Sequence, residues 1–300
     1  MNASEKNTTN FASKTISGHS SPVIDIHVHP WTLDFMEKNE CIKFAINFFH
    51  IPKENLPKSI DDLVSDMNES GVDRSVILGQ DMRSVYRQEF RNYTLPNKVL
   101  ADLVGKYPDR FIAFGAVDPH KEDALKELAV LAKDYGFKGI KMHCDALGIY
   151  PNDKILYPIY EKCVEYGLVV LHHTGTTGLG YCKIKFGHPV DLDDVAQDFP
   201  DLKIICAHFG WPWMEECFAV ATRNPNVYID ISGWLARYFP PLLITYMNGL
   251  LKDKMLFGTD YPMIRTPLWM MEFNEFCRPK LKEGVAEKIL GVNAKNLLNI

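Results

Sequence analysis

The chain has 300 residues, of which 46% are hydrophobic and 24% are charged, and its formal net charge at pH 7 is -5. This is ordinary globular composition with ample length for a large core. The acidic balance lacks the basic surface typical of nucleic-acid-binding proteins, so no nucleic-acid partner is expected. No apolar run reaches membrane-spanning length, so no membrane association is expected either.

The seven cysteines are odd in number and irregularly spaced, with no Cys-x-x-Cys pair. This argues against a disulfide framework and against a cysteine zinc site, and it favours a reducing, cytoplasmic location. Residues 1–22 are rich in Ser, Thr and Asn and lack the apolar segment of a signal peptide. We therefore expect a flexible N-terminal tail there.

From residue 23 onwards, short apolar runs alternate with amphipathic segments. The apolar runs are nearly unbroken, as is typical of parallel strands buried on both faces. We predict strands at 23–29, 72–79, 111–118, 139–143, 168–173, 203–208, 227–232 and 255–260. We predict helices at 59–70, 97–107, 120–135, 153–166, 190–199, 213–223 and 239–251. Several end at a glycine, namely Gly71, Gly136 or Gly167.

Eight strands that alternate with helices predict a single α/β domain over residues 23–300, a (β/α)8 TIM barrel. The alternative is an open, doubly wound sheet. Such a sheet would carry a glycine-rich phosphate loop after an early strand, whereas the first strand here ends in His-Pro-Trp. Segments 267–276, 285–290 and 293–299 would supply the last helix and a closing one. The aromatic connection 30–58 is too long for a simple loop, and we expect an insertion over the active site or a subunit contact.

Histidines and one aspartate mark the ends of the predicted strands. Active sites of such barrels cluster at the C-terminal ends of the strands. The residues found there are His27, His29, Lys141, His143, His172, His173, His208 and Asp260. Imidazole nitrogens with a carboxylate suit zinc, and also manganese, iron or cobalt. The sequence predicts one divalent metal ion, with Zn2+ as first choice and Mn2+ as an alternative, and such an ion can activate water.

Four ordered motifs resemble those of the amidohydrolase superfamily. They are Asp-Ile-His-Val-His at 25–29, His-His-Thr-Gly at 172–175, Ala-His-Phe-Gly at 207–210 and Gly-Thr-Asp-Tyr-Pro at 258–262. More specifically they resemble the amidohydrolase-related branch, which contains the aminocarboxymuconate-semialdehyde decarboxylases. The resemblance runs from about residue 23 to the end of the chain. It implies a metal-dependent barrel enzyme, usually with one metal ion, that acts on a small molecule and is commonly a homodimer.

The resemblance implies that His27, His29, His173 and Asp260 bind the metal. Asp260 would also accept a proton from the activated water. His208 would act as acid or base, polarise the substrate, or approach the metal as a weak ligand. His172 directly precedes His173 on a strand, so we expect its ring to point the other way and lie outside the site.

The sequence leaves more than one role open for Lys141 and for Asp25. Two-metal members of the superfamily use a carboxylated lysine from the fourth strand to bridge the metals. Because the branch resembled here usually uses one metal, we interpret Lys141 as a buried or substrate-facing lysine. Asp25 is predicted to share a strand face with His27 and to lie deeper in the barrel. We expect it to hydrogen-bond a metal-binding residue rather than bind the metal itself.

Residues that follow the strand ends are candidates for substrate contact: Trp31, Lys141, Tyr150, Trp211 and Arg265. The tryptophans would form walls, or alternatively pack their own loops. Arg265 would clamp a carboxylate, or alternatively form a surface ion pair. The glycine-rich loop at 175–180 is interpreted as a mobile covering of the active site.

The leading functional hypothesis is a hydrolase. Metal-activated water would attack a carbonyl of a small acyl or carboxylated substrate while Asp260 and His208 move protons. The alternative is a lyase that decarboxylates an aromatic or unsaturated carboxylic acid nonoxidatively, for which Arg265 would face the metal. A third hypothesis is a barrel that binds metal or ligand without catalysis, and the complete set of ligand residues argues against it.

Overall fold

Eight parallel strands form a barrel in the computed structural model, which describes residues 21–82, 93–180 and 182–300. In the order of their pairing the strands are β1 (Ile24–Val28), β2 (Arg74–Leu78), β5 (Phe111–Gly115), β6 (Gly139–Met142), β7 (Val169–His172), β8 (Ile204–Cys206), β9 (Val227–Asp230) and β10 (Met255–Leu256). The Ile26 N–H donates to the Phe257 carbonyl at 2.9 Å, which joins the first and last strands. The predicted TIM barrel is therefore confirmed. Residues 1–20 of the predicted tail lie outside the described residues.

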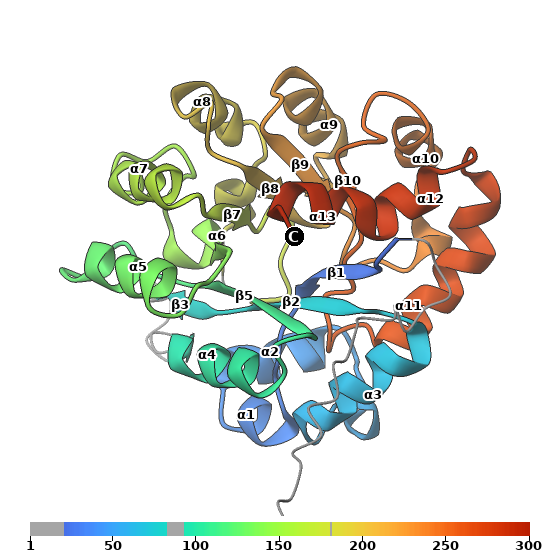
Figure 1. The fold of residues 1–300 in the computed structure, drawn as a ribbon, viewed down its shortest axis with the longest axis horizontal. Helices are drawn as coiled ribbons and strands as arrows, with labels where there is room; N and C mark the ends of the chain where they lie inside the picture. Colours follow the sequence, from blue (N-terminus) through green and yellow to red (C-terminus); the bar gives the residue numbers. More distant parts are fainter. Residues whose placement is uncertain (1–20, 83–92, 181) are drawn as a thin grey trace, which may run out of the picture.

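Helices surround the barrel as an outer ring (Figure 1). They are α3 (Ile60–Ser70), α4 (Asn97–Lys106), α5 (Ala124–Lys133), α7 (Tyr157–Tyr166), α8 (Asp191–Asp198), α9 (Met214–Arg223), α10 (Pro241–Met247), α11 (Thr266–Glu272) and α12 (Val285–Glu287). The last helix, α13 (Asn293–Leu298), lies apart from this ring (Figure 1). Ser59 begins α3, and its N–H donates to the Asp62 side chain at 3.0 Å, as in a capping box. Gly71 and Gly167 end α3 and α7 with φ of 68° and 66°. These two predicted helix ends are confirmed.

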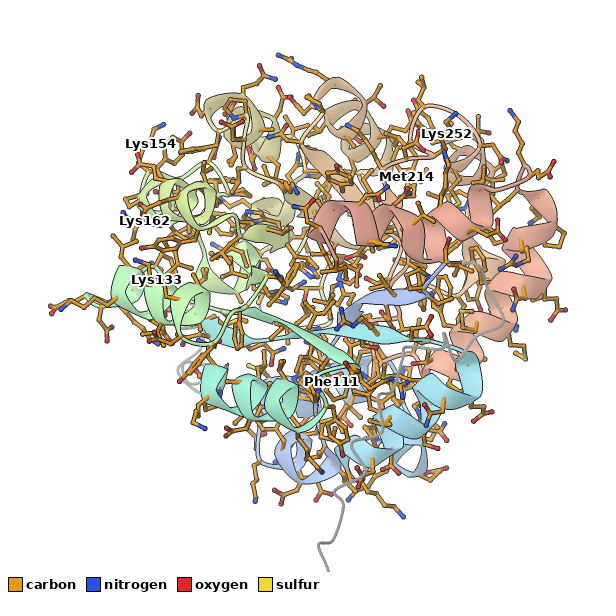
Figure 2. The ribbon with its side chains drawn as sticks, in the orientation of Figure 1. Phe111, Lys133, Lys154, Lys162, Met214 and Lys252 are labelled. Atoms are coloured by element: carbon orange, nitrogen blue, oxygen red, sulfur yellow. The ribbon has the colours of Figure 1, made fainter. Side chains whose placement is uncertain are left out.

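Charged side chains lie on the outer surface of the helical ring. Lys133, Lys154 and Lys162 project from its outer side (Figure 2). Among the residues that the structure describes, no helix is long and apolar enough to cross a membrane.

The N-terminal end of the barrel is sealed by apolar side chains. Ala294, Leu297 and Leu298 of α13 pack with interior side chains of most strands, among them Ile24, Val76, Ile112, Val169, Ile205 and Leu256. Figure 1 shows α13 lying across this end of the barrel. Because α13 and this core close one end, a ligand site is confined to the opposite end, where the strands finish.

The predicted insertion at 30–58 contains two helices, α1 (Leu33–Glu37) and α2 (Glu40–Phe48), and a 3-10 turn, η1 (Lys53–Asn55). Ala45 and Phe49 from this segment line the same cavity as the histidines at the strand ends. The insertion therefore covers the C-terminal face of the barrel, as expected from its length and aromatic content.

Some local features differ from the prediction. A short antiparallel hairpin, β3 (Gln80–Met82) with β4 (Tyr93–Leu95), follows β2, and its strands are too short to show a period. A short helix, α6 (Cys144–Leu147), follows β6 directly. The predicted strands 203–208 and 255–260 shorten to β8 and β10, because the residues that carry the candidate site turn out of the strands.

The α13 seal leads to a prediction about stability. Leu297 is 2% exposed, so Leu297→Ala should lower the free energy of unfolding by about 2–5 kcal/mol, the usual range for a buried leucine. Leu250→Ala is the matched control, because Leu250 is 73% exposed and should change it by less than about 0.5 kcal/mol. Urea unfolding followed by fluorescence measures both. Equal effects of the two substitutions would contradict the sealing role.

Candidate metal centre and active-site cavity

A register shift in β1 decides how its two histidines point. Between Asp25 and Val28, β1 carries one residue more than its partner β2. Such a bulge bends a strand and re-aims its side chains. As a result Ile26 packs in the barrel interior while the next residue, His27, also reaches groups on other strands of the barrel.

The Nε2 atoms of His27 and His29 converge on Asp260, whose Oδ1 lies 3.4 Å from the first and 3.3 Å from the second. Burial lowers the pKa of His27 to about 3 and lowers the pKa of His29, so both imidazoles are neutral at pH 7. Burial opposes ionisation of Asp260, but the hydrogen bond with His29 and the proximity of His208 and His27 outweigh it and hold its pKa at about 2. Neutral imidazoles with an ionised carboxylate are the protonation states that a divalent metal requires.

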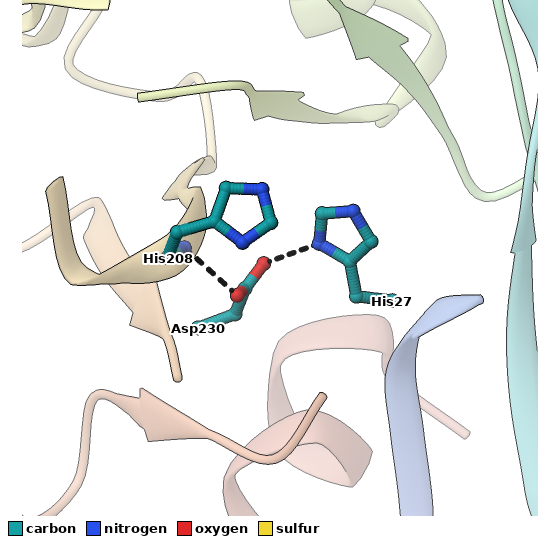
Figure 3. Close-up of side chains that lie close together, drawn as sticks. All are labelled: His27, His208 and Asp230. Atoms are coloured by element: carbon teal, nitrogen blue, oxygen red, sulfur yellow. Dashed lines mark hydrogen bonds and ion pairs between the residues drawn. The ribbon is translucent and has the colours of Figure 1, made fainter. Parts of the chain in front are cut away.

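His27 also belongs to a second group of ligand-type atoms, formed with His208 and Asp230 (Figure 3). Asp230 is already engaged there. Its carboxylate accepts from His27 Nδ1 at 2.9 Å, from the His208 N–H at 3.1 Å and from the Ser232 N–H at 3.0 Å. A metal in this group would have to displace those donors, so His27, His29 and Asp260 form the better candidate site. Their nitrogen and oxygen atoms, all within 4.8 Å of one another, fit zinc or manganese.

Asp230 was not predicted as a site residue. It ends β9 and is fully buried. Because it accepts from Nδ1, it leaves Nε2 of His27, which faces Lys141 Nζ and Asp260, as the atom that would bind a metal. Burial opposes its ionisation, but the interactions with His27 outweigh that effect and hold the pKa of Asp230 well below its usual range. The sequence could have indicated this role, because Asp230 and Ser232 are two residues apart at the end of a predicted strand, as His27 and His29 are.

His208 and Asp260 adopt left-handed backbone conformations, with φ of 57° and 63°. Each such conformation costs a non-glycine residue about 1–3 kcal/mol and is typical of functional sites. The backbone bond from His208 to Asp230 and the bond from the Asp260 N–H to the His27 carbonyl, 2.9 Å, hold these turns in place. The His208 ring has its Nδ1 2.9 Å from Ser232 Oγ, which leaves Nε2 for a substrate.

His173 lies on the cavity wall but belongs to neither group of converging atoms. Its Nε2 is 3.1 Å from the Thr176 carbonyl oxygen, and its ring stacks on that of His143 with centroids 4.6 Å apart. Metal binding by His173 would require its ring to leave Thr176, so this role stays a prediction. His143, for which the sequence suggested no role, lines the cavity beside it.

Lys141 lies beside the candidate metal site. Its Nζ is 3.4 Å from His27 Nε2, and the residue is 3% exposed. Burial lowers the pKa of Lys141 to about 8, against the opposing effects of Asp230 and Asp260. Lys141 is absent from the described cavity wall, so the structure favours a buried lysine facing His27 over one that faces a substrate.

Two further residues are placed by the structure. His172 points away from the site, and its ring nitrogens lie 3.2 Å from the Tyr160 hydroxyl and 3.7 Å from the Cys144 sulfur. Asp25 was expected to hydrogen-bond a metal-binding residue rather than bind the metal itself. Its carboxylate accepts from the His27 N–H at 3.1 Å and from the Thr259 hydroxyl at 2.7 Å. It therefore anchors both the backbone of His27 and the loop that carries Asp260, although a one-residue bulge interrupts β1 beyond Asp25.

An aromatic cavity of about 100 Å³ opens above the candidate metal site. Besides the histidines it is lined by Trp31, Phe49, Gln80, Leu179, Trp211, Trp234 and Met263. Trp31 stacks on His29 with ring centroids 4.4 Å apart and donates from Nε1 to Gln80 at 2.9 Å. An apolar protein cavity of about 150 Å³ holds one benzene molecule. The present cavity is smaller, so it limits a ligand to about one ring.

Arg265 and Tyr150 lie outside the cavity wall as described. The Arg265 guanidinium pairs with the buried carboxylate of Asp66 on α3. Tyr150 is 37% exposed and packs on Phe186 with ring centroids 4.7 Å apart. The structure does not support the predicted carboxylate clamp, because the charge of Arg265 is engaged by Asp66. The second alternative, an ion pair, is what it shows.

The glycine-rich loop after β7 packs tightly under the insertion. A Cβ atom at Gly178 would lie 2.2 Å from the Phe49 ring, and one at Gly180 would lie 2.2 Å from the Phe44 ring. These contacts are shorter than any side chain tolerates, so glycine is required for close approach of the two segments. Together they form the roof of the cavity.

The fold and the converging imidazoles and carboxylate define a metal-dependent barrel enzyme. The chain belongs to the amidohydrolase family, whose model matches residues 24–300. It is 26% identical over 242 residues to 2-amino-3-carboxymuconate-6-semialdehyde decarboxylase of Dictyostelium discoideum. That match covers 68% of this chain and 65% of the relative, so it spans just under two thirds of the relative's length.

Other similar proteins differ in their activities. L-fucono-1,5-lactonase of Burkholderia ambifaria is 23% identical over 267 residues, covering 81% of this chain and 85% of the relative. An uncharacterized TIM-barrel protein of Bordetella bronchiseptica superposes with a TM-score of 0.78 at 26% identity, covering 93% and 98% of the two chains. A 5-carboxyvanillate decarboxylase of Novosphingobium aromaticivorans, complexed with manganese and a nitrobenzoic acid, shares the fold at a TM-score of 0.67 and 19% identity, covering 94% and 97%.

The contacts of Asp230 lead to a prediction about metal affinity. Asp230→Ala should weaken binding of Zn2+ or Mn2+ about 10–100-fold, because His27 loses the partner that orients its ring. Competition with a fluorescent chelator measures the affinity, and the melting temperature shows whether the variant is folded. Asp253→Ala is the matched control, since the Asp253 side chain is 59% exposed. Unchanged affinity in folded Asp230→Ala would contradict the orienting role.

His172 leads to a prediction about pH. Burial, with a smaller effect of Lys141, lowers the pKa of His172 from 6.5 to about 3. Between these values the unfolded chain binds a proton that the folded chain does not, so stability falls as pH falls. His172→Gln should therefore reduce the slope of unfolding free energy against pH by about 1 kcal/mol per unit between pH 4 and 6. Urea unfolding of the metal-free protein at several pH values measures this slope, and an unchanged slope would contradict the assignment.

Proposed function

We propose that the protein is a metal-dependent carboxy-lyase that removes carbon dioxide nonoxidatively from a small aromatic or unsaturated carboxylic acid. The observation that carries the proposal is the single-ring cavity of aromatic side chains directly above His27, His29 and Asp260. The decarboxylase from Dictyostelium and the decarboxylases among the structural neighbours support it. These comparisons favour decarboxylation over the hydrolase expected first from the sequence.

His27, His29 and Asp260 would hold the metal, with His173 as a further predicted ligand. A bound divalent ion would supply positive charge that binds the substrate carboxylate and stabilises negative charge developing on the reacting group. Among the described residues of the cavity wall there is no lysine or arginine. A carboxylate bound at the metal would therefore take its counter-charge from the metal and from Lys141, whose Nζ lies 3.4 Å from His27 Nε2. Zinc and manganese both suit the donor set, and manganese is bound in one decarboxylase neighbour.

His208 would carry the proton in this reaction. The bond between the carboxyl group and its carbon breaks, carbon dioxide leaves, and the carbon gains one proton. His208 lines the cavity, and its Nδ1 is held by Ser232. Its Nε2 is therefore placed to deliver that proton. Trp31, Trp211 and Trp234 would hold the ring and exclude water, which would otherwise compete for the substrate.

Hydrolysis of a small lactone is the second candidate function. The observation that favours it is the similarity to L-fucono-1,5-lactonase, which covers 81% of this chain. The same imidazoles and carboxylate would serve, with Asp260 accepting a proton from water. The two reactions differ in whether water enters the product.

One experiment separates them. Protein loaded with Zn2+ or Mn2+ is incubated with a panel of aromatic acids and lactones in heavy-oxygen water, and the products are analysed by mass spectrometry. The account predicts release of one equivalent of carbon dioxide, with no heavy oxygen in the organic product. His208→Gln should lower the rate about 10²–10⁴-fold with metal content unchanged. Heavy oxygen in a new carboxyl group would mean lactone hydrolysis and would contradict the proposal.

A further inference from the structure

His143 is a cavity residue that neither the metal site nor the proton transfer uses. It follows β6 directly, is 7% exposed and forms part of the cavity wall. Its ring stacks on that of His173 at an interplanar angle of 16°. The ring therefore has one fixed plane at the edge of the space that a substrate would occupy.

Asp145 determines which nitrogen of His143 faces a ligand. Its Oδ1 lies 3.2 Å from His143 Nδ1, and the residue is fully buried. Its Oδ2 has no hydrogen-bond partner among the described residues. The imidazole of His143 is therefore the group that can donate a hydrogen bond to this buried carboxylate. A buried carboxylate binds a donor, which places the proton of His143 on Nδ1. Nε2 is then left as the lone-pair acceptor of a residue that forms part of the cavity wall.

We infer that His143 is a specificity-determining residue whose Nε2 accepts a hydrogen bond from a hydroxyl group of the substrate. The inference rests on the proposed function, whose substrate it narrows to a hydroxylated carboxylic acid. A site built to bond a hydroxyl rejects an analogue that lacks it, because the buried acceptor is then left without a partner. An acceptor also discriminates against a methyl ether, which has the oxygen but no proton to donate.

The test compares ligands that differ only in the donor. Dissociation constants of benzoate, its three monohydroxy isomers and their methyl ethers are measured by calorimetry on the metal-loaded protein. At least one hydroxybenzoate should bind about tenfold or more tightly than both benzoate and its own methyl ether. His143→Phe should reduce that preference to within about twofold with metal content unchanged. His143→Gln, which returns an acceptor oxygen near the position of Nε2, should restore part of it.

His120→Phe is the matched control, because the His120 ring also bonds an aspartate, with Nδ1 2.8 Å from Asp118 Oδ1, but lies outside the described cavity wall. It should leave the preference intact. A wild-type protein without hydroxyl preference, or a preference that survives His143→Phe, would overturn the inference. Loss of the metal in His143→Phe would also overturn it, since His143 would then belong to the metal site. Binding does not require turnover. Loss of the preference without carbon dioxide release would therefore uphold His143 as a hydroxyl acceptor and refute only the proposed reaction.

Discussion

The buried carboxylate of Asp230 is the interaction on which the rest of the site depends. From the end of β9 it reaches Nδ1 of His27 on β1 and the backbone N–H of His208 after β8. The first bond leaves Nε2 of His27 as the nitrogen that would bind a metal, and the second holds the strained turn that presents His208. A fully buried charge is costly unless its partners are complete. The ends of β1, β8 and β9 are therefore held in place by one shared set of hydrogen bonds.

The N-terminal end of the barrel contributes to stability, and the C-terminal end carries the candidate site. Apolar side chains of α13 fill the N-terminal end of the barrel, so a ligand has no access to the interior from that end. At the other end the strands stop early, and turns with positive φ present His208 and Asp260. The insertion and the glycine-rich loop then meet over these residues, where Phe49 contacts Gly178. A small aromatic cavity results, and its chemistry comes from the strand ends beneath it.

The barrel could be predicted from the sequence because strands buried on both faces carry unbroken apolar runs whatever their partners are. The approach of His27 and His29 to Asp260 likewise followed from their places at strand ends. Asp25 was expected to hydrogen-bond a metal-binding residue, and it does bond the His27 N–H, but a one-residue bulge interrupts the strand face on which this was inferred. The role of Arg265 did not follow from the sequence. Its partner Asp66 lies 199 residues away in the chain, and no local pattern reveals such a pair.

Asp230 and His143 show a different limit. A single aspartate or histidine at the end of a strand has no pattern that distinguishes a structural role from a functional one. Only its contacts decide, and these join residues as far apart as 203 positions, as between His27 and Asp230. The same holds for Asp145, whose importance rests on a bond to His143 and on its complete burial. The resemblance supplied the predicted ligand set, and the structure added the residues that contact its members.

The most direct test of the account is the position of the metal. Crystals of the protein loaded with Zn2+ or Mn2+ would be measured at the absorption edge of that metal, and the anomalous difference map would locate it. The account predicts one peak in contact with Nε2 of His27, Nε2 of His29 and the Asp260 carboxylate, with Asp230 still bonded to His27 Nδ1. A peak between His27 Nδ1, His208 and Asp230 would contradict it.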